Sequence, residues 1–257
     1  MYRIAFLLLF YCLGLHAQTY QFTDSLQLDA DRFIGYDGYG HLYTINQGAL
    51  HKSGDLGEFV FQEFQLGPIE SVDLINPLNL VVYFREVNTV VFLDNRLNEI
   101  ERINFNTEGL ANTAAVTNAG NNRLWVFDID NQQLQLYDYR SKRSTLFSQP
   151  FQGIPIAMAS DFNDCYVLTE NKLRQINIYG SLLSEVATNN ITRLSRNGNS
   201  VLCQQESKLL EWRENQWVIL EIDLGKIAVT ELQLTQDLLY IYNGITLYSY
   251  SKKQPKQ

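Results

Sequence analysis

The chain holds only three histidines, the residue type that most often moves protons in catalysis. His16 lies in the apolar N-terminal segment, and His41 and His51 lie close together shortly after that segment ends. A nucleophilic triad needs a histidine placed between a nucleophile and a carboxylate. Both later histidines fall in or beside short strand-like segments, so we expect them to serve packing or solvation. The sequence therefore predicts no catalytic residue.

The strongest local cluster of oxygen ligands is Asp128-Ile129-Asp130-Asn131. Calcium requires about six to eight oxygen ligands, and a helix–loop–helix calcium loop adds a central glycine and a distal glutamate. This cluster has neither. We expect a solvated turn between two strands, with no metal ion and no cofactor.

The N-terminal segment has the organisation of a secretory signal. Arg3 is followed by an apolar run over 4–15, and Ala17 offers a small residue at a cleavage site. The run is shorter than the roughly 20 residues that span a membrane. We predict a signal peptide over 1–17, a globular domain over 18–251 and a polar C-terminal tail over 252–257. The expected location is the periplasm or cell envelope of a bacterium, with secretion as an alternative.

Composition narrows the classes of partner. The formal charge is −8 and 12% of the residues are aromatic. A protein that binds nucleic acid normally presents a basic face, so we expect no nucleic-acid partner. No segment after the leader is long and apolar enough to suggest a membrane span. Cys165 and Cys203 lie in apolar, strand-like runs on different repeats, and we expect both to be unpaired.

A repeat of about forty residues dominates the chain after the leader. Its most regular feature is an apolar strand preceded by a turn rich in Asp, Asn and Gly. The second residues of the six apolar pairs are separated by 39, 43, 41, 36 and 38 residues. The six pairs are Leu42-Tyr43, Val81-Val82, Leu124-Trp125, Cys165-Tyr166, Val201-Leu202 and Leu239-Tyr240.

This period, with four strands in each unit, is typical of a β-propeller blade. Six apolar pairs predict an all-β, six-bladed propeller of four-stranded antiparallel blades. The last unit has one strand after its apolar pair, Thr246 to Tyr250, and therefore lacks an outermost strand. Thr19 to Thr23 alternates as a strand and precedes the first unit. We predict that this N-terminal strand completes the last blade, which would leave no free outer edge.

A propeller brings the loops between its second and third strands, and those that enter each blade, to one rim. Five of the rim charges on second-to-third-strand loops are carboxylates and one is an arginine, so the mouth is expected to be acidic and to favour a cationic or polyhydroxyl ligand or a basic partner surface. Alternatively, the charges only keep the face soluble. The candidate binding residues are Glu70, Arg85, Glu86, Asp128, Asp130, Glu170, Arg193 and Glu206.

The turn and strand Asp37-Gly38-Tyr39-Gly40-His41-Leu42-Tyr43 resemble those of the NHL-like and TolB-like six-bladed propellers, as does the segment Leu124-Trp125-Val126-Phe127-Asp128. The resemblance implies the fold and says little about activity, because propellers carry many functions.

We expect a monomeric, non-catalytic interaction or scaffold module that binds another envelope protein. One alternative is a hydrolase or lyase resembling the lactonase and arylesterase propellers, with a metal in the channel. Another is a carbohydrate- or small-ligand-binding propeller that uses rim carboxylates and aromatic residues.

Overall fold

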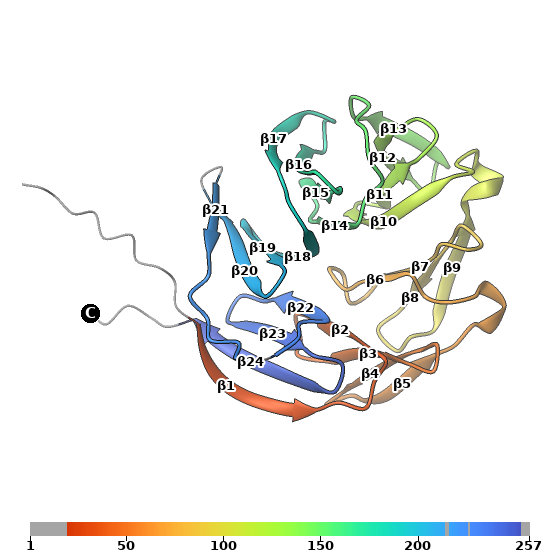
Figure 1. The fold of residues 1–257 in the computed structure, drawn as a ribbon. Coiled ribbons are helices and arrows are strands. Elements are labelled where there is room, and N and C mark those ends of the chain that lie inside the picture. The colour runs from red at the N-terminus through yellow and green to blue at the C-terminus, as the bar shows by residue number, and fades with distance from the viewer. Residues whose placement is uncertain (1–19, 214–215, 226, 253–257) are drawn as a thin grey trace, which may run out of the picture.

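The computed structural model describes residues 20–213, 216–225 and 227–252. Six sheets stand around a common centre (Figure 1), and each sheet consists of four strands. Every pairing within the sheets is antiparallel, from the β2–β3 pair of the first blade to the β23–β24 pair of the last. The predicted six-bladed propeller is confirmed.

The blades follow the chain, and each begins with its innermost strand. The first three blades are β2 (Arg32–Tyr36), β3 (Leu42–Asn46), β4 (Ala49–Gly54) and β5 (Gly57–Phe61); β6 (Ser71–Asp73), β7 (Leu80–Phe84), β8 (Thr89–Leu93) and β9 (Glu99–Asn104); and β10 (Thr113–Gly120), β11 (Arg123–Asp128), β12 (Gln133–Asp138) and β13 (Arg143–Phe147). Two short 3-10 helices, η1 (Phe64–Leu66) and η2 (Phe105–Glu108), lie between these blades.

The last three blades have the same order, except that the outermost strand of blade 6 is the N-terminal strand. They are β14 (Ala157–Ser160), β15 (Asp164–Leu168), β16 (Lys172–Asn177) and β17 (Leu182–Ala187); β18 (Ile191–Asn197), β19 (Ser200–Gln205), β20 (Lys208–Arg213) and β21 (Gln216–Ile219); and β22 (Glu231–Leu234), β23 (Leu238–Tyr242), β24 (Thr246–Lys252) and β1 (Tyr20–Gln27).

The apolar strands of the repeat are the second strands of the blades. All residues of Leu80–Phe84 and of Asp164–Leu168 are buried, because a blade is covered by a neighbour on each face. One apolar cluster lies at each junction between neighbouring blades. The continuous apolar runs therefore reflect burial on both faces, as in the strands of covered sheets.

Blade 6 closes the ring by pairing the two ends of the chain. β1 runs antiparallel to β24, with Tyr20 opposite Lys252 and Gln27 opposite Thr246. The predicted closure of the last blade by the N-terminal strand is confirmed (Figure 1). The predicted signal peptide over 1–17 lies outside the described residues, as do residues 253–257 of the predicted tail.

Side chains from one blade satisfy the free backbone edge of the next around the channel. The Gln233 amide accepts from the Tyr36 N–H and donates to the Tyr36 carbonyl, both at 2.7 Å, as an added strand would. Gly35 makes this approach possible, since a Cβ there would lie 2.7 Å from Gln233 Nε2. The Ser195 hydroxyl accepts from the Leu234 N–H at 2.8 Å. Edge groups that would otherwise be unpaired thus hold the ring together.

The closure predicts a disulfide between the first and last strands. Asp24 and Ser249 are direct partners in the β1–β24 ladder, and opposite residues of an antiparallel pair lie within reach of a disulfide. The double variant Asp24→Cys/Ser249→Cys should oxidise to one intramolecular bond. The oxidised form should be about 2 to 4 kcal/mol more stable than the reduced form in urea denaturation.

Among the described residues, the thiols of Cys165 and Cys203 are both free and buried, so they do not compete with this reaction. The single variant Asp24→Cys is the control and should show no such gain. Failure of the double variant to cross-link under oxidising conditions would contradict the β1–β24 pairing.

Candidate functional site

The ring has two faces that differ in their connections. The loop face carries the loops that join second to third strands and the segments that lead from one blade to the next. The turn face, at the opposite end, carries the turns that join first to second and third to fourth strands. Both definitions follow from the strand order of the six blades.

The candidate residues from the sequence lie on the loop-face side. Glu70 and Arg85 form an ion pair at 4.0 Å, which joins the segment entering blade 2 to the loop between β7 and β8. Arg193 lies in β18 rather than in a loop, and its Nε donates to the Thr230 carbonyl at 2.6 Å. Four of the remaining candidates are exposed to solvent: Glu86, Asp130, Glu170 and Glu206.

Asp128 differs from the other candidates because it is buried. Its carboxylate accepts from the Asp130 N–H at 3.0 Å, from Asn131 Nδ2 at 2.6 Å and from Gln135 Nε2 at 2.8 Å. The Asp130 carboxylate accepts from Asn112 Nδ2 at 3.0 Å. Amide donors therefore surround the oxygens of the Asp128–Asn131 turn and define its shape. Among the described residues, no group of three or more His, Cys, Asp or Glu side chains is placed to hold a metal ion.

The loop face also carries an arginine–glutamate–arginine arrangement that the sequence did not indicate. Glu231 at the start of β22 lies 3.8 Å from Arg32 Nε of blade 1 and 3.8 Å from Arg193 Nε of blade 5. Burial raises the pKa of Glu231, and the two arginines oppose that effect. Arg32 also donates to the Ile69 carbonyl of the segment entering blade 2 at 2.9 Å. The inner rim of the loop face therefore carries both positive and negative side chains. Their contacts join blade 6 to blades 1 and 5.

A buried cluster in blade 1 contains the residue types of acid–base catalysis. Asp37 Oδ2 lies 3.0 Å from His41 Nδ1, 3.1 Å from the Tyr43 hydroxyl and 3.9 Å from Lys52 Nζ. Asp37 Oδ1 accepts from the backbone N–H of Tyr39 at 2.9 Å and of His41 at 3.0 Å. Burial tends to raise the pKa of Asp37, but these hydrogen bonds outweigh it and hold the pKa below the usual value.

The same cluster anchors blade 1 to blade 2. Lys52 is buried, its pKa is lowered by that burial despite the nearby Asp37, and its Nζ donates to the Asn95 carbonyl of blade 2 at 2.8 Å. His51 lies in β4 opposite Thr44 and Val60 and does not join the cluster. The arrangement fixes the turn after β2 and the contact with the next blade.

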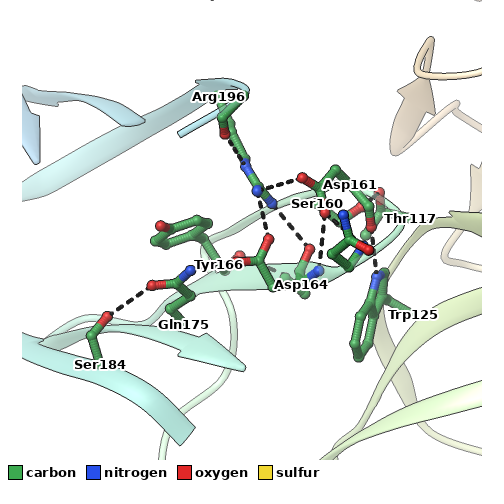
Figure 2. Close-up of polar contacts among 12 residues, drawn as sticks. Thr117, Trp125, Ser160, Asp161, Asp164, Tyr166, Gln175, Ser184 and Arg196 are labelled. Atoms are coloured by element: carbon green, nitrogen blue, oxygen red, sulfur yellow. Dashed lines mark hydrogen bonds and ion pairs between the residues drawn. The ribbon is translucent and has the colours of Figure 1, made fainter. Parts of the chain in front are cut away.

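A second buried polar network joins blades 3, 4 and 5 near the turn face (Figure 2). Arg196 of blade 5 donates to Asp161 Oδ2 at 2.6 Å and to the Asp164 carbonyl at 3.0 Å, and its guanidinium lies 5.0 Å from the centre of the Tyr166 ring. Trp125 of blade 3 donates to the Asp161 carbonyl at 3.2 Å. One turn in blade 4 is therefore held from both neighbours.

Asp and Asn side chains shape many tips of the turn face. In each of three turns, the side-chain oxygen of the first residue accepts from the backbone N–H two residues later, an Asx turn. These hydrogen bonds are Tyr39 N–H to Asp37 at 2.9 Å, Leu78 N–H to Asn76 at 3.2 Å and Tyr179 N–H to Asn177 at 2.9 Å. The same geometry recurs at Asp94 with Arg96 and at Asp138 with Arg140.

The donor residue of these turns is a large side chain exposed to solvent. Tyr39, Leu78 and Tyr179 are 70%, 60% and 76% exposed. Arg96 and Arg140 occupy the same place in their turns and are exposed as well. Tyrosine and arginine are enriched among the residues that dominate binding energy at protein interfaces. The turn face therefore presents these types on backbone that is already ordered.

Comparison with solved structures shows the fold. The chain superposes on a catalytically inactive virginiamycin B lyase from Staphylococcus aureus with quinupristin (TM-score 0.61, 10% identity, 88% of this chain and 82% of that chain). It also superposes on the Cps50 (Swd1) β-propeller domain from Myceliophteria thermophila (TM-score 0.63, 10% identity, 90% of this chain and 99% of that chain).

A third similar structure is PorZ, a bacterial surface component of the type-IX secretion system of Porphyromonas gingivalis (TM-score 0.53, 12% identity, 91% of this chain and 39% of that chain). No family model and no curated protein matches the chain. At these identities, the likeness is one of fold. Within the described residues, no helix has the length and apolar character needed to cross a membrane.

Proposed function

We propose that the protein is a non-catalytic propeller that binds another protein through its turn face. The observation that carries this proposal is the set of Asx turns that hold Tyr39, Leu78 and Tyr179 outward. Ordering a flexible side chain or loop at an interface costs free energy, and a preformed turn reduces that cost. Exposed tyrosine and leucine side chains in fixed positions suit a partner with an apolar, complementary surface.

The buried polar clusters support a structural use for the residue types of acid–base chemistry. Asp37, His41 and Lys52 are buried and bonded to one another or to blade 2. A general acid or base must come within hydrogen-bond reach of the proton it transfers. Here those atoms contact protein groups that hold the blade and its turn. The alternative of a lyase or hydrolase would need a site elsewhere on the ring.

We further propose that the protein is exported and acts in the periplasm or cell envelope as a monomer, and that it is of the NHL-like or TolB-like type. The predicted signal peptide over 1–17 supports export, and the similarity of fold to a bacterial surface component of a secretion system agrees with an envelope role. A partner in the same compartment follows from this location.

The test is affinity capture from envelope extract with three forms of the tagged protein. The turn-face variant is Tyr39→Ser/Leu78→Ser/Tyr179→Ser. The matched control is Val60→Ser/Ile100→Ser/Phe147→Ser, whose side chains are 51–54% exposed on the outermost strands β5, β9 and β13. We expect the wild type and the control to capture the same specific partner, quantified by mass spectrometry. The turn-face variant should capture at least tenfold less of that partner.

The loop-face charges form the second candidate surface, and a further variant separates the two. Arg85→Ala/Glu86→Ala/Asp130→Ala/Glu170→Ala changes exposed residues and leaves the buried Asp128 in place. The proposal expects this variant to keep the partner. Loss of the partner with this variant alone would move binding to the loop face.

A further inference from the structure

A pocket of about 350 Å³ lies between blades 4 and 5. Its walls come from the end of β17, the segment leading to β18, and all four strands of blade 5. Six blades around a ring diverge towards the outside, so side chains must fill a wedge between neighbouring outer strands. Here they leave it partly open. The volume lies in the range of roughly 300–1,000 Å³ that small-ligand pockets occupy.

The lining is partly apolar and partly polar but uncharged, and blade 5 contributes both kinds of side chain. Leu210, Trp217 and Ile219 contribute apolar surface. Thr188, Asn189 and Gln205 contribute a hydroxyl and two amides. None of the residues lining the pocket has an ionisable side chain. An ionised ligand would lose hydration there without gaining an opposite charge, so the pocket favours a neutral ligand.

The polar groups are held in place by bonds to the surrounding chain. Gln205 Nε2 donates to the Asn189 carbonyl at 2.7 Å, which fixes the amide plane and leaves the Oε1 side for another donor. The Thr188 hydroxyl donates to the Glu170 carbonyl at 3.3 Å, and a hydroxyl oxygen keeps lone pairs for a second bond. Both groups therefore offer acceptors in defined directions.

The Trp217 side chain is also held in place by its neighbour. Trp217 lies opposite Trp212 in the β20–β21 ladder, with ring centres 5.0 Å apart and planes at 56°. Trp212 is buried, so it supports Trp217 from the blade interior. Trp217 Nε1 is buried without a hydrogen-bond partner. Because that nitrogen is buried, Trp217 offers the pocket its apolar ring and no hydrogen-bond donor.

We propose that this pocket binds a neutral sugar in its pyranose form. A pyranose presents an apolar C–H face and a rim of hydroxyls, which match the Trp217 indole and the nearby amide and hydroxyl groups of Gln205, Asn189 and Thr188. This ligand site goes beyond the proposed protein-binding function and uses none of the turn-face residues. The two can therefore fail separately.

The test measures sugar binding to the purified protein without any protein partner. The probes are glucose, galactose and N-acetylglucosamine, with glucuronate and glucose 6-phosphate as ionised counterparts. Saturation-transfer NMR and tryptophan fluorescence titration should give a Kd of about 1 mM or tighter for at least one neutral sugar. The ionised counterparts should bind at least tenfold more weakly.

Two variants locate the binding. Gln205→Leu removes the amide acceptor and should lower the affinity for the sugar at least fivefold. Trp217→Leu should lower it by at least the same factor. Gln62→Leu, an exposed glutamine on the segment after β5, is the matched control and should bind as wild type does. Absence of saturable binding by all three neutral sugars, or equal binding by wild type and Gln205→Leu, would overturn the proposal.

Discussion

Replacing Arg196 with methionine should lower the free energy of unfolding by about 3 to 5 kcal/mol. The Arg196 side chain is only 5% exposed and lies 2.5 Å from Asp164 Oδ1 and 2.6 Å from Asp161 Oδ2. Methionine keeps much of the packing against Tyr166 but leaves the buried Asp164 carboxylate without its cation. Urea denaturation followed by tryptophan fluorescence measures the change, and Arg196→Lys should lose less because it keeps the charge.

Arg140→Met is the control for this prediction. Arg140 also forms an ion pair, at 3.2 Å with Glu101, but its side chain is 62% exposed. An exposed pair contributes about 0 to 1 kcal/mol, so the control should remain within that range. A similar loss in both variants would show that burial of the Arg196 network is not what stabilises the junction between blades 4 and 5.

Replacing Asp37 with asparagine should lower the free energy of unfolding at pH 7 by about 3 to 5 kcal/mol. The change removes the counter-charge 3.9 Å from the buried Lys52 and an acceptor of the Tyr43 hydroxyl. Asp138→Asn is the control, because Asp138 caps a similar but more open turn in blade 3. The control should lose about 1 kcal/mol.

The pH dependence supplies a second readout for Asp37. Its pKa in the folded protein lies below the ordinary value of 3.8, because hydrogen bonds to the carboxylate outweigh the effect of burial. The carboxylate therefore stabilises the fold above pH 3.8, and this stabilisation is lost as the pH falls through the lower, folded pKa. The difference in stability between wild type and Asp37→Asn should narrow over that acidic range. A constant difference across it would contradict the assignment.

The fold could be predicted because its signals are local and repeated. The second strand of each blade lies inside its sheet and is covered by neighbouring blades, so Leu42-Tyr43 and its five counterparts recur at nearly even spacing. The closing strand could be predicted because blade 6 had one strand too few and the N-terminal segment alternated. The Asp- and Asn-rich turns also indicated where strands end.

The contacts between blades could not be predicted in the same way. Glu231 meets Arg32, which is far away in the sequence, only because the ring brings blade 6 beside blade 1. Asp128 was expected at the rim by its loop position, but Gln135 and Asn131 supply donors that allow it to be buried. The sequence of an Asx turn likewise does not predict that the side chain of Tyr39 or Tyr179 is exposed. The exposure depends on which surfaces the neighbouring blade covers.

The most direct test of the central claim is the affinity of the purified protein for its captured partner. Isothermal titration calorimetry should give a Kd at least tenfold weaker, equivalent to about 1.4 kcal/mol, for Tyr39→Ser/Leu78→Ser/Tyr179→Ser than for wild type. The outer-strand control Val60→Ser/Ile100→Ser/Phe147→Ser should bind within twofold of wild type. Equal affinity of the turn-face variant and wild type, or equal losses in both variants, would contradict binding through the Asx turns.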